Sequence, residues 1–97
     1  MTKHVQIAIV ILNWNGEKLF DIFLPSVIKN SNTENIEIIV ADNGSSDKSV
    51  QHLKQFYPSV KIIDLKTNFG FAEGYNQALK QVDSKYLIFL NSDVKVT

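Results

Sequence analysis

The chain has no cysteine and no arginine among its 97 residues. Without cysteine it can form no disulfide framework, zinc finger or thiol nucleophile. Its ten lysines are balanced by ten acidic residues, so no face is basic enough to hold a nucleic-acid backbone. No apolar run approaches the roughly 20 residues that a membrane-spanning helix needs. We therefore expect neither a nucleic-acid partner nor a membrane span in this segment.

The composition is that of one small soluble domain. Apolar residues make up 44% of the chain and charged residues 21%, which is enough apolar surface for a single core. Four short apolar runs rich in Ile and Val are predicted to be strands, and we expect the first, second and fourth to be buried on both faces. The runs span residues 6–12, 36–41, 60–65 and 86–90.

Apolar residues at helical spacing separate these runs. The first helix has an apolar stripe between residues 19 and 28, and Pro25 should kink or restart it. Ser46 is expected to cap a second helix that Pro58 ends, and a third is predicted between residues 72 and 82. The alternation predicts an α/β fold: an open, mostly parallel sheet of about four strands in β-α-β-α-β-α-β order, Rossmann-like, with helices on both faces.

Polar side chains follow every predicted strand. Ligands of open parallel sheets bind at the carboxyl ends of the strands. A single cluster of Asn, Asp, Gly and Ser there is more simply explained by turns and helix caps. Four clusters, two of them with strand-end carboxylates, favour a binding site. They occupy residues 12–16, 41–47, 66–74 and 91–93.

Asp42 is the strongest candidate in the second cluster. Its carboxylate would project from a strand tip, where it can accept the imide N–H of uracil or thymine and so distinguish these bases from cytosine. The alternative is an Asp that caps its own turn. Asn43 and Gly44 form a common turn pair, and residues 45–47 are typical of a helix start, so we interpret them as scaffold.

The first and third clusters allow two interpretations each. Asn13, Trp14 and Asn15 present two amides and an indole that could contact a base or ribose, but Trp14 could equally close the end of the core. Gly16 is expected to allow the turn. Residues 66–74 favour a tight loop whose backbone N–H groups approach a ligand, although they contain neither a P-loop nor a GxGxxG pattern. Glu73 within them is typical of an acid in the first turn of a helix.

The fourth cluster closes the stretch YLIFLNSDV, residues 86–94. A carboxylate such as Asp93 beside apolar neighbours is costly unless a cation satisfies it, and a divalent metal that bridges two phosphates is one such cation. Magnesium or manganese shared with substrate phosphates fits better than structural zinc. Asn91 could align Asp93 or touch a ribose. The alternative is a simple cap or turn after a buried strand.

Taken in order, the motifs ILNWNG, ADNGSSDKS, NFGFAEGYNQAL and FLNSDV cover nearly the whole chain. Together they resemble the N-terminal half of a family 2 glycosyltransferase, an inverting enzyme of the A-type nucleotide-diphospho-sugar fold, and most closely its rhamnosyltransferase-like branch. The resemblance implies that Asn13 and Asn15 lie at the donor pocket, Asp42 binds the nucleobase and Asp93 is the metal-binding end of the DxD motif. That motif reads NSD here, with Asn91 in place of the first carboxylate.

The resemblance also implies what the chain binds. The donor would be a UDP-type or dTDP-type sugar with a Mg or Mn ion, and the parent enzyme would transfer its sugar to an acceptor hydroxyl with inversion. The expected donor-binding residues are Asn13, Trp14, Asn15, Asp42, Asn43, Asn68, Gly70, Asn91 and Asp93, with Asp93 also the metal ligand.

The same resemblance places the acceptor half and the catalytic base beyond Thr97. Residues 1–97 would then be a truncated donor-binding part, inactive alone, of an enzyme of cell-surface polysaccharide biosynthesis. The full-length enzyme would lie in the cytoplasm or at the cytoplasmic face of the membrane. An unpaired edge at residues 86–90 would favour self-association. Two rival hypotheses are a receiver-like signalling module and a stand-alone nucleotide-binding domain. A phosphoacceptor site, however, needs an acidic pair and a downstream lysine that the strand ends lack.

Overall fold

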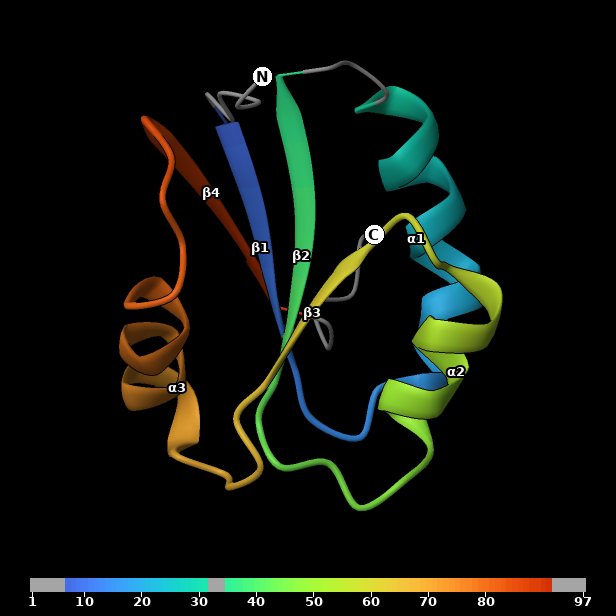
Figure 1. Cartoon of the computed structure of the whole chain (residues 1–97). Coiled ribbons are helices and arrows are strands. Elements are labelled where there is room, and N and C mark those ends of the chain that lie inside the picture. Colours follow the sequence, from blue (N-terminus) through green and yellow to red (C-terminus); the bar gives the residue numbers. More distant parts are fainter. Residues whose placement is uncertain (1–6, 32–34, 92–97) are drawn as a thin grey trace.

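A computed structural model describes residues 7–31 and 35–91 as three layers, with one sheet between helices on both faces (Figure 1). All strand pairs are parallel. The strands are β1 (Ile7–Asn13), β2 (Ile36–Asp42), β3 (Lys61–Asp64) and β4 (Tyr86–Asn91). The helices are α1 (Glu17–Asn30), α2 (Ser49–Phe56) and α3 (Gly70–Leu79). The predicted α/β fold and element order are confirmed.

The strand order in the sheet is β3-β2-β1-β4. This is the order in the first half of a Rossmann sheet, whereas receiver and flavodoxin-like domains place the second strand at the edge, in the order 2-1-3-4-5. From β1 the chain first builds outward through β2 and β3 and then returns to add β4 on the other side. Ligands of such sheets bind where this direction reverses, so the topology points to the carboxyl ends of β1 and β4.

Two apolar cores fill the space between the layers. Alternate residues of a strand face opposite sides of the sheet, so β1 contributes Ile9 and Ile11 to one core and Ala8, Val10 and Leu12 to the other. The core under α1 and α2 contains Ile9, Ile11, Phe20, Leu24, Ile38, Val40, Leu53 and Val60. The core under α3 contains Ala8, Val10, Leu12, Ile39, Ala41, Ile63 and Ala78. This double burial fixes the register of the central strands.

Helix α1 continues through Pro25 as one helix and does not restart there. Pro25 is exposed, and a proline at this position leaves the carbonyl of Asp21 without its helical amide partner. Asp21 is exposed too, so water can bond that carbonyl and the helix is not broken. None of the helices within the described ranges is both long and apolar enough to cross a membrane.

The expectation that β4 is buried on both faces is wrong. Among the described residues the strand lies at the sheet edge and pairs only with β1, and its apolar side chains from Tyr86 to Leu90 remain 37 to 58% exposed. Partial cover comes from α3, where the ring of Tyr75 contacts Phe89 and its hydroxyl donates to the carbonyl of Leu90. An apolar run predicts a strand, but the run alone does not determine how many neighbours the strand has.

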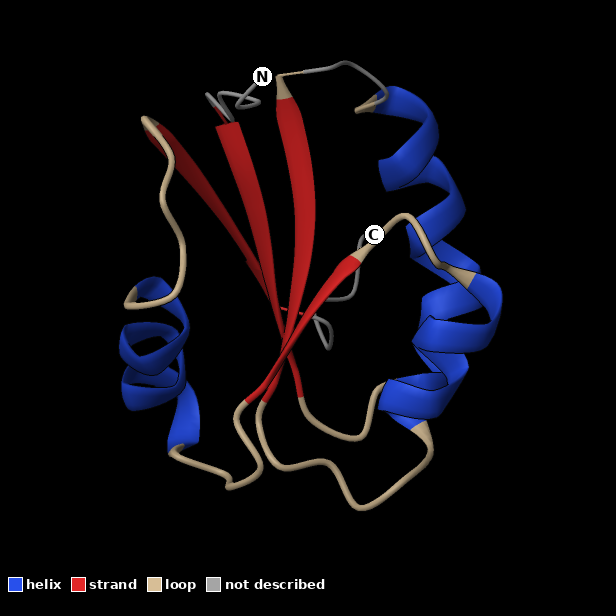
Figure 2. Cartoon of the chain, in the orientation of Figure 1, coloured by secondary structure: helices blue, strands red, loops and turns tan. Residues whose placement is uncertain are grey.

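The polar clusters in the described residues share one edge of the sheet, as predicted. The loops that follow β1, β2 and β3 lie together at the lower edge of Figure 2. In the strand register, Asn13 is opposite Asp42, Asp42 is opposite Asp64, and Leu12 is opposite Asn91. We call this edge the carboxyl rim.

Candidate functional site

Asp42 and Asn13 form the centre of the carboxyl rim. Asp42 is 2% exposed and Asn13 is fully buried. The amide of Asn13 donates to Asp42 Oδ1 over 2.9 Å, and Ser45 donates to the same oxygen through its hydroxyl over 2.6 Å. The backbone N–H of Ser45 donates to Asp42 Oδ2 over 3.0 Å. Asp42 therefore does cap its own turn, the alternative raised from the sequence. A carboxylate accepts roughly four hydrogen bonds, however, so Oδ2 keeps a free acceptor position.

The amide oxygen of Asn13 is the one buried side-chain polar atom without a hydrogen-bond partner in the part of the chain that the structure describes. Its orientation follows from Asp42, because a reversed amide would place its oxygen against the carboxylate. An unsatisfied buried acceptor costs about 1–3 kcal/mol. The rim thus holds an unmet buried acceptor directly beside Asp42.

Asn15 joins the first two loops of the rim. Its Oδ1 accepts the backbone N–H groups of Ser46, over 2.7 Å, and of Asp47, over 3.2 Å. Asn15, and not Gly16, adopts the left-handed conformation of the turn, with φ of 53°. Gly16 lies in the turn, as expected, but with φ of −100°, and the left-handed position falls on Asn15 because asparagine also tolerates this region. The side chain of Asn15 positions the loop after β2.

Trp14 is 55% exposed, so it does not close the end of the core. Its neighbours Asn13 and Asn15 are both tied to the loop after β2. Trp14 therefore extends from a well-anchored turn, and its ring is accessible for stacking. Of the two interpretations from the sequence, the ligand-facing one fits its exposure.

Asn43 links the second and third loops. It is 3% exposed, and its amide donates to the carbonyl of Gly70 over 3.0 Å and to Asn68 Oδ1 over 3.3 Å. Its own oxygen accepts the N–H of Phe69 over 2.9 Å. Gly44, with φ of 73°, has the backbone of Asn68 so close that a Cβ would lie 2.5 Å from its nitrogen. The sequence identified these residues but not the contact between the two loops.

The second helix begins later than the sequence predicted. Ser46 was expected to cap the helix, but the helix starts at Ser49. Lys48 occupies the N-cap position, and its side chain makes no capping hydrogen bond. Asp47 satisfies the free backbone instead, since its Oδ1 accepts the N–H of Ser49 over 3.0 Å and also bonds the hydroxyl of Ser49. Ser46 is held by Asn15, so its hydroxyl is directed away from the helix start.

A pocket of about 600 Å³ opens beside Asp42, between the start of α2 and the ends of β2 and β3. This volume lies within the range of small-molecule sites, about 300–1,000 Å³. Its lining residues are Asp42, Gly44, Ser45, Asp47, Lys48, Val50, Gln51, Lys54, Asp64 and Lys66. Sequence reasoning missed the contribution of Gln51, Lys54 and Asp64. Of these three residues, only Asp64 could have been found from the sequence, because it is a carboxylate at the end of a predicted strand. In the structure it is in register with Asp42.

The remaining predicted site residues are only partly placed. Asn91 ends β4 beside Leu12 at the carboxyl rim, by its backbone pairing. Asp93, the predicted metal ligand, lies outside the described residues. The described residues contain no group of three or more His, Cys, Asp or Glu side chains that could hold a metal ion. The structure thus brings together Asn13, Asp42 and the loops around them, and leaves the metal prediction untested.

Comparison with known proteins agrees with this geometry. The profile of the family described as Glycosyl transferase family 2 matches residues 8–97. The teichoic acid poly(glycerol phosphate) polymerase of Staphylococcus epidermidis is 30% identical over 91% of this chain and 13% of its own length. The uncharacterized glycosyltransferase YfnE of Bacillus subtilis is 37% identical over 90% of this chain and 23% of its own length. The chain therefore spans well under a third of these curated relatives.

Solved structures show the same fold. Staphylococcus aureus TarS in complex with UDP-GlcNAc aligns with a TM-score of 0.73 and 26% identity, over 91% of this chain and 26% of that one. The mannosyltransferase PcManGT of Pyrobaculum calidifontis, solved with GDP-Man and Mn2+, aligns with a TM-score of 0.79 over 95% of this chain and 28% of its own. Its 16% identity supports the fold alone. The strand order, the polar carboxyl rim and the profile match agree: the chain belongs to glycosyl transferase family 2.

Proposed function

We propose that this chain forms the donor-binding part of a glycosyltransferase, whose donor is a UDP-type or dTDP-type sugar and whose acceptor is a hydroxyl group. Family membership supports the reaction class. The observation that carries the proposal is the unsatisfied oxygen of Asn13 beside Asp42, at the end of the sheet where ligands of this topology bind. The UDP-GlcNAc in the TarS structure favours a uridine nucleotide among the possible donors.

We expect hydrogen-bond acceptors of the protein to recognise the nucleobase of the donor. Uracil and thymine each present one imide N–H, while cytosine has an unprotonated ring nitrogen at that position. The free lone pair of Asp42 Oδ2 and the unmet oxygen of Asn13 are both acceptors, and the exposed ring of Trp14 supplies a surface for stacking. Asn15, Asn43, Asn68 and Gly70 would hold the surrounding loops in place. Their observed bonds are between loops, so we assign them a supporting role at the donor site.

A divalent cation, Mg or Mn, would be bound by Asp93 together with the donor's two phosphates, with Asn91 close by. This arrangement fits the chemistry of Mg²⁺, which keeps few protein ligands and shares substrate phosphates. The described residues contain no group of three or more side chains that could hold a metal ion, and Asp93 is the ligand that the NSD motif proposes. When bound, such a cation stabilises negative charge on a leaving diphosphate.

Transfer would proceed by in-line displacement. The acceptor oxygen forms a bond to the anomeric carbon, the bond from that carbon to the diphosphate oxygen breaks, and the configuration inverts. A general base must take the proton of the acceptor hydroxyl. We assign that role to a part of the enzyme outside these 97 residues, which span well under a third of the curated relatives. Residues 1–97 would then supply donor binding but not the complete reaction.

The cellular setting extends the same proposal. The relatives include a teichoic acid poly(glycerol phosphate) polymerase and the poly(ribitol-phosphate) beta-N-acetylglucosaminyltransferase TarS. We propose a comparable role in cell-surface polysaccharide synthesis, using cytoplasmic nucleotide sugars, with the complete protein in the cytoplasm or at the cytoplasmic face of the membrane. Cell fractionation of a tagged full-length protein would test it, and recovery outside the cytoplasm and its membrane would contradict it.

Calorimetric titration of the chain with UDP, dTDP and CDP, with and without Mn2+, tests the donor assignment. We expect UDP or dTDP to bind more tightly than CDP, and Mn2+ to strengthen binding in the wild type but not in Asp93→Ala. Equal, metal-independent binding in both proteins would reject the role of Asp93. Equal affinity for UDP and CDP would reject recognition of the imide.

Self-association through β4 is a separate proposal. The strand is an edge with five consecutive exposed apolar residues, from Tyr86 to Leu90, and such edges pair with other chains. Light scattering across a concentration series would show growth in mass, and Ile88→Lys should suppress it. A monomer at every concentration would contradict the proposal.

A further inference from the structure

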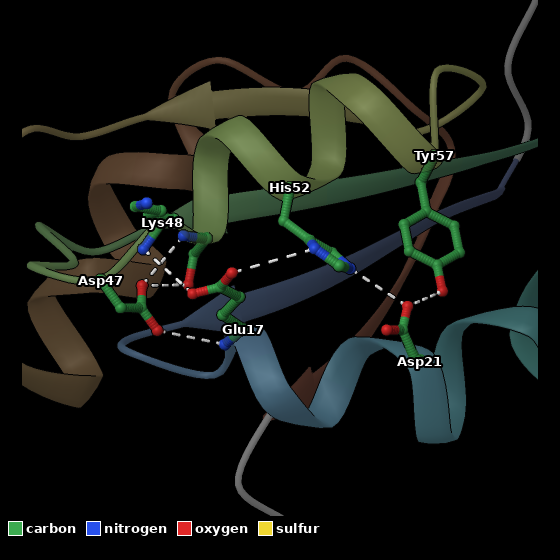
Figure 3. A network of polar contacts seen from close by, with 7 residues as sticks. Glu17, Asp21, Asp47, Lys48, His52 and Tyr57 are labelled. Carbon is green, nitrogen blue, oxygen red and sulfur yellow. Dashed lines mark hydrogen bonds and ion pairs between the residues drawn. The ribbon is translucent and has the colours of Figure 1, made fainter.

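Helices α1 and α2 lie side by side on one face of the sheet, and His52 of α2 stands between two carboxylates of α1 (Figure 3). The Nε2 atom of His52 lies 3.1 Å from Asp21 Oδ1, and its Nδ1 atom lies 3.9 Å from Glu17 Oε2. The imidazole is only 16% exposed. Each ring nitrogen thus faces a different carboxylate, in a partly buried position where ion pairs are screened less than at the surface.

The charge of His52 determines whether the ring interacts favourably with one of these carboxylates or with both. A neutral imidazole has one N–H, which can donate to Asp21, whereas an imidazolium also carries a positive charge that attracts Glu17 across 3.9 Å. The titratable groups in contact with the ring are Glu17 and Asp21 from α1 and Tyr57 at the end of α2, and Phe20 and Phe56 supply apolar contacts. Protonation of His52 therefore adds an attraction between α1 and α2 that the neutral form lacks.

Tyr57 keeps Asp21 in this arrangement. Its hydroxyl donates to Asp21 Oδ1, and this bond, followed by the one from His52, lowers the pKa of Asp21. Burial, then the bond to Asp21, raises the pKa of Tyr57 to about 12, so the hydroxyl stays protonated across the physiological range. Asp21 is thus a fixed negative partner, and the variable contact of His52 is the one to Glu17.

Glu17 connects His52 to the candidate site. Its Oε1 accepts the backbone N–H of Lys48 over 3.2 Å, and its own backbone N–H donates to Asp47 Oδ2 over 3.2 Å. Asp47 in turn caps α2 at Ser49. These reciprocal bonds hold the segment that starts α2, and Asp47 and Lys48 both line the pocket beside Asp42.

We propose that His52 is a positioning residue for the nucleotide site, which acts through Glu17 on the Asp47–Lys48 segment and makes donor affinity dependent on pH. The inference deepens the proposed function and rests on it. Histidine changes its charge between about pH 5 and 8. A charged ring attracts Glu17 and so stabilises the Asp47–Lys48 wall of the pocket, which favours donor binding at acidic pH. With a neutral ring that attraction is lost, and the wall keeps the two bonds from Glu17 and the bond from Asn15 to the N–H of Asp47.

The test is the dissociation constant of UDP for the 97-residue chain, measured by calorimetry between pH 5.5 and 8.5 at fixed ionic strength. The variants are His52→Gln and Glu17→Gln, with His4→Gln as the matched control because it removes the other histidine. Glu17→Gln keeps an oxygen for the Lys48 N–H but loses the charge that attracts His52. Circular dichroism at each pH checks that every variant is folded.

We expect the wild type and His4→Gln to bind UDP about two- to five-fold more tightly at the acidic end, the size of one partly exposed ion pair. Titration of UDP itself affects all variants equally, so the informative quantity is the difference between the wild-type and variant slopes. Both His52→Gln and Glu17→Gln should lose the pH dependence that is specific to the wild type. Identical slopes in the wild type and in either folded variant would overturn the inference. No UDP binding at any pH would instead remove the proposed function on which it rests.

Discussion

Replacement of Gly44 by alanine is the sharpest test of how the rim is built. At Gly44 an added Cβ would lie 2.5 Å from the nitrogen of Asn68, 2.6 Å from the carbonyl carbon of Thr67 and 2.9 Å from its Cα. All three atoms belong to the backbone, so no side chain can rotate away. Gly44 also has φ of 73°, where alanine is strained. Either the loop after β2 or the loop after β3 must move.

Gly70→Ala is the matched control. Gly70 has φ of 77°, but its added Cβ would meet nothing within 4 Å. Both variants therefore share the cost of a left-handed alanine, about 1–2 kcal/mol. Gly44→Ala adds the displacement of packed backbone, about 1–3 kcal/mol by analogy with overpacked cores. We expect Gly70→Ala to lower the free energy of unfolding by about 1–2 kcal/mol and Gly44→Ala by about 2–5 kcal/mol.

Urea unfolding, followed by circular dichroism, measures both losses. Both of these loops belong to the carboxyl rim, so Gly44→Ala should also weaken UDP binding more than Gly70→Ala does. Equal destabilisation by the two alanines would refute the close contact between the loops, because the conformational cost is common to both.

Three further predictions concern the helices. Tyr57→Phe should remove a tyrosine whose ionisation in an ultraviolet pH titration is centred near pH 12. With the pKa of Tyr57 raised to about 12, the stability that this residue contributes is complete below about pH 10 and is lost as the pH rises toward 12. Asp21→Asn should destabilise the chain at neutral pH; because the pKa of Asp21 is lowered, the difference in unfolding free energy should shrink as the pH falls below about 4. Leu24→Ala should cost about 2–5 kcal/mol in urea unfolding because Leu24 is fully buried, whereas Ile22→Ala, at a position 75% exposed, should change stability by under about 0.5 kcal/mol.

The fold followed closely from patterns in the sequence. Short Ile- and Val-rich runs and apolar helical stripes fixed the element order, and parallel pairing then required the strand ends to share an edge. That reasoning correctly brought Asn13 and Asp42 together. The exposure of β4 did not follow, because an apolar run at a sheet edge and one at its centre have the same composition. Edge position depends on which other strands are present.

The hydrogen bonds between the loops of the carboxyl rim could not be predicted from the sequence. Asn15 binds Ser46 across 31 residues of chain, and Asn43 binds Gly70 across 27, so no local pattern records either contact. The resemblance placed both asparagines at the donor, whereas the turn pattern at Asn43 indicated scaffold; both side chains hold neighbouring loops. The start of α2 was misplaced for a related reason, because Ser46, Asp47 and Ser49 are all good capping residues and only the tertiary contact with Asn15 selects among them.

The central claim is that a nucleotide binds at the carboxyl rim against Asp42. The fluorescence of Trp14 provides a direct test of it. Trp14 is the single tryptophan of the chain and is 55% exposed at that rim. Its fluorescence during titration with UDP should change saturably in the wild type and in the control Asp83→Asn, which alters an exposed acid in the segment leading into β4, where the strands begin. Asp42→Ala should abolish or greatly weaken the response while remaining folded. A saturable response of equal affinity in Asp42→Ala, or UDP binding by calorimetry with no change in Trp14 emission, would contradict the claim.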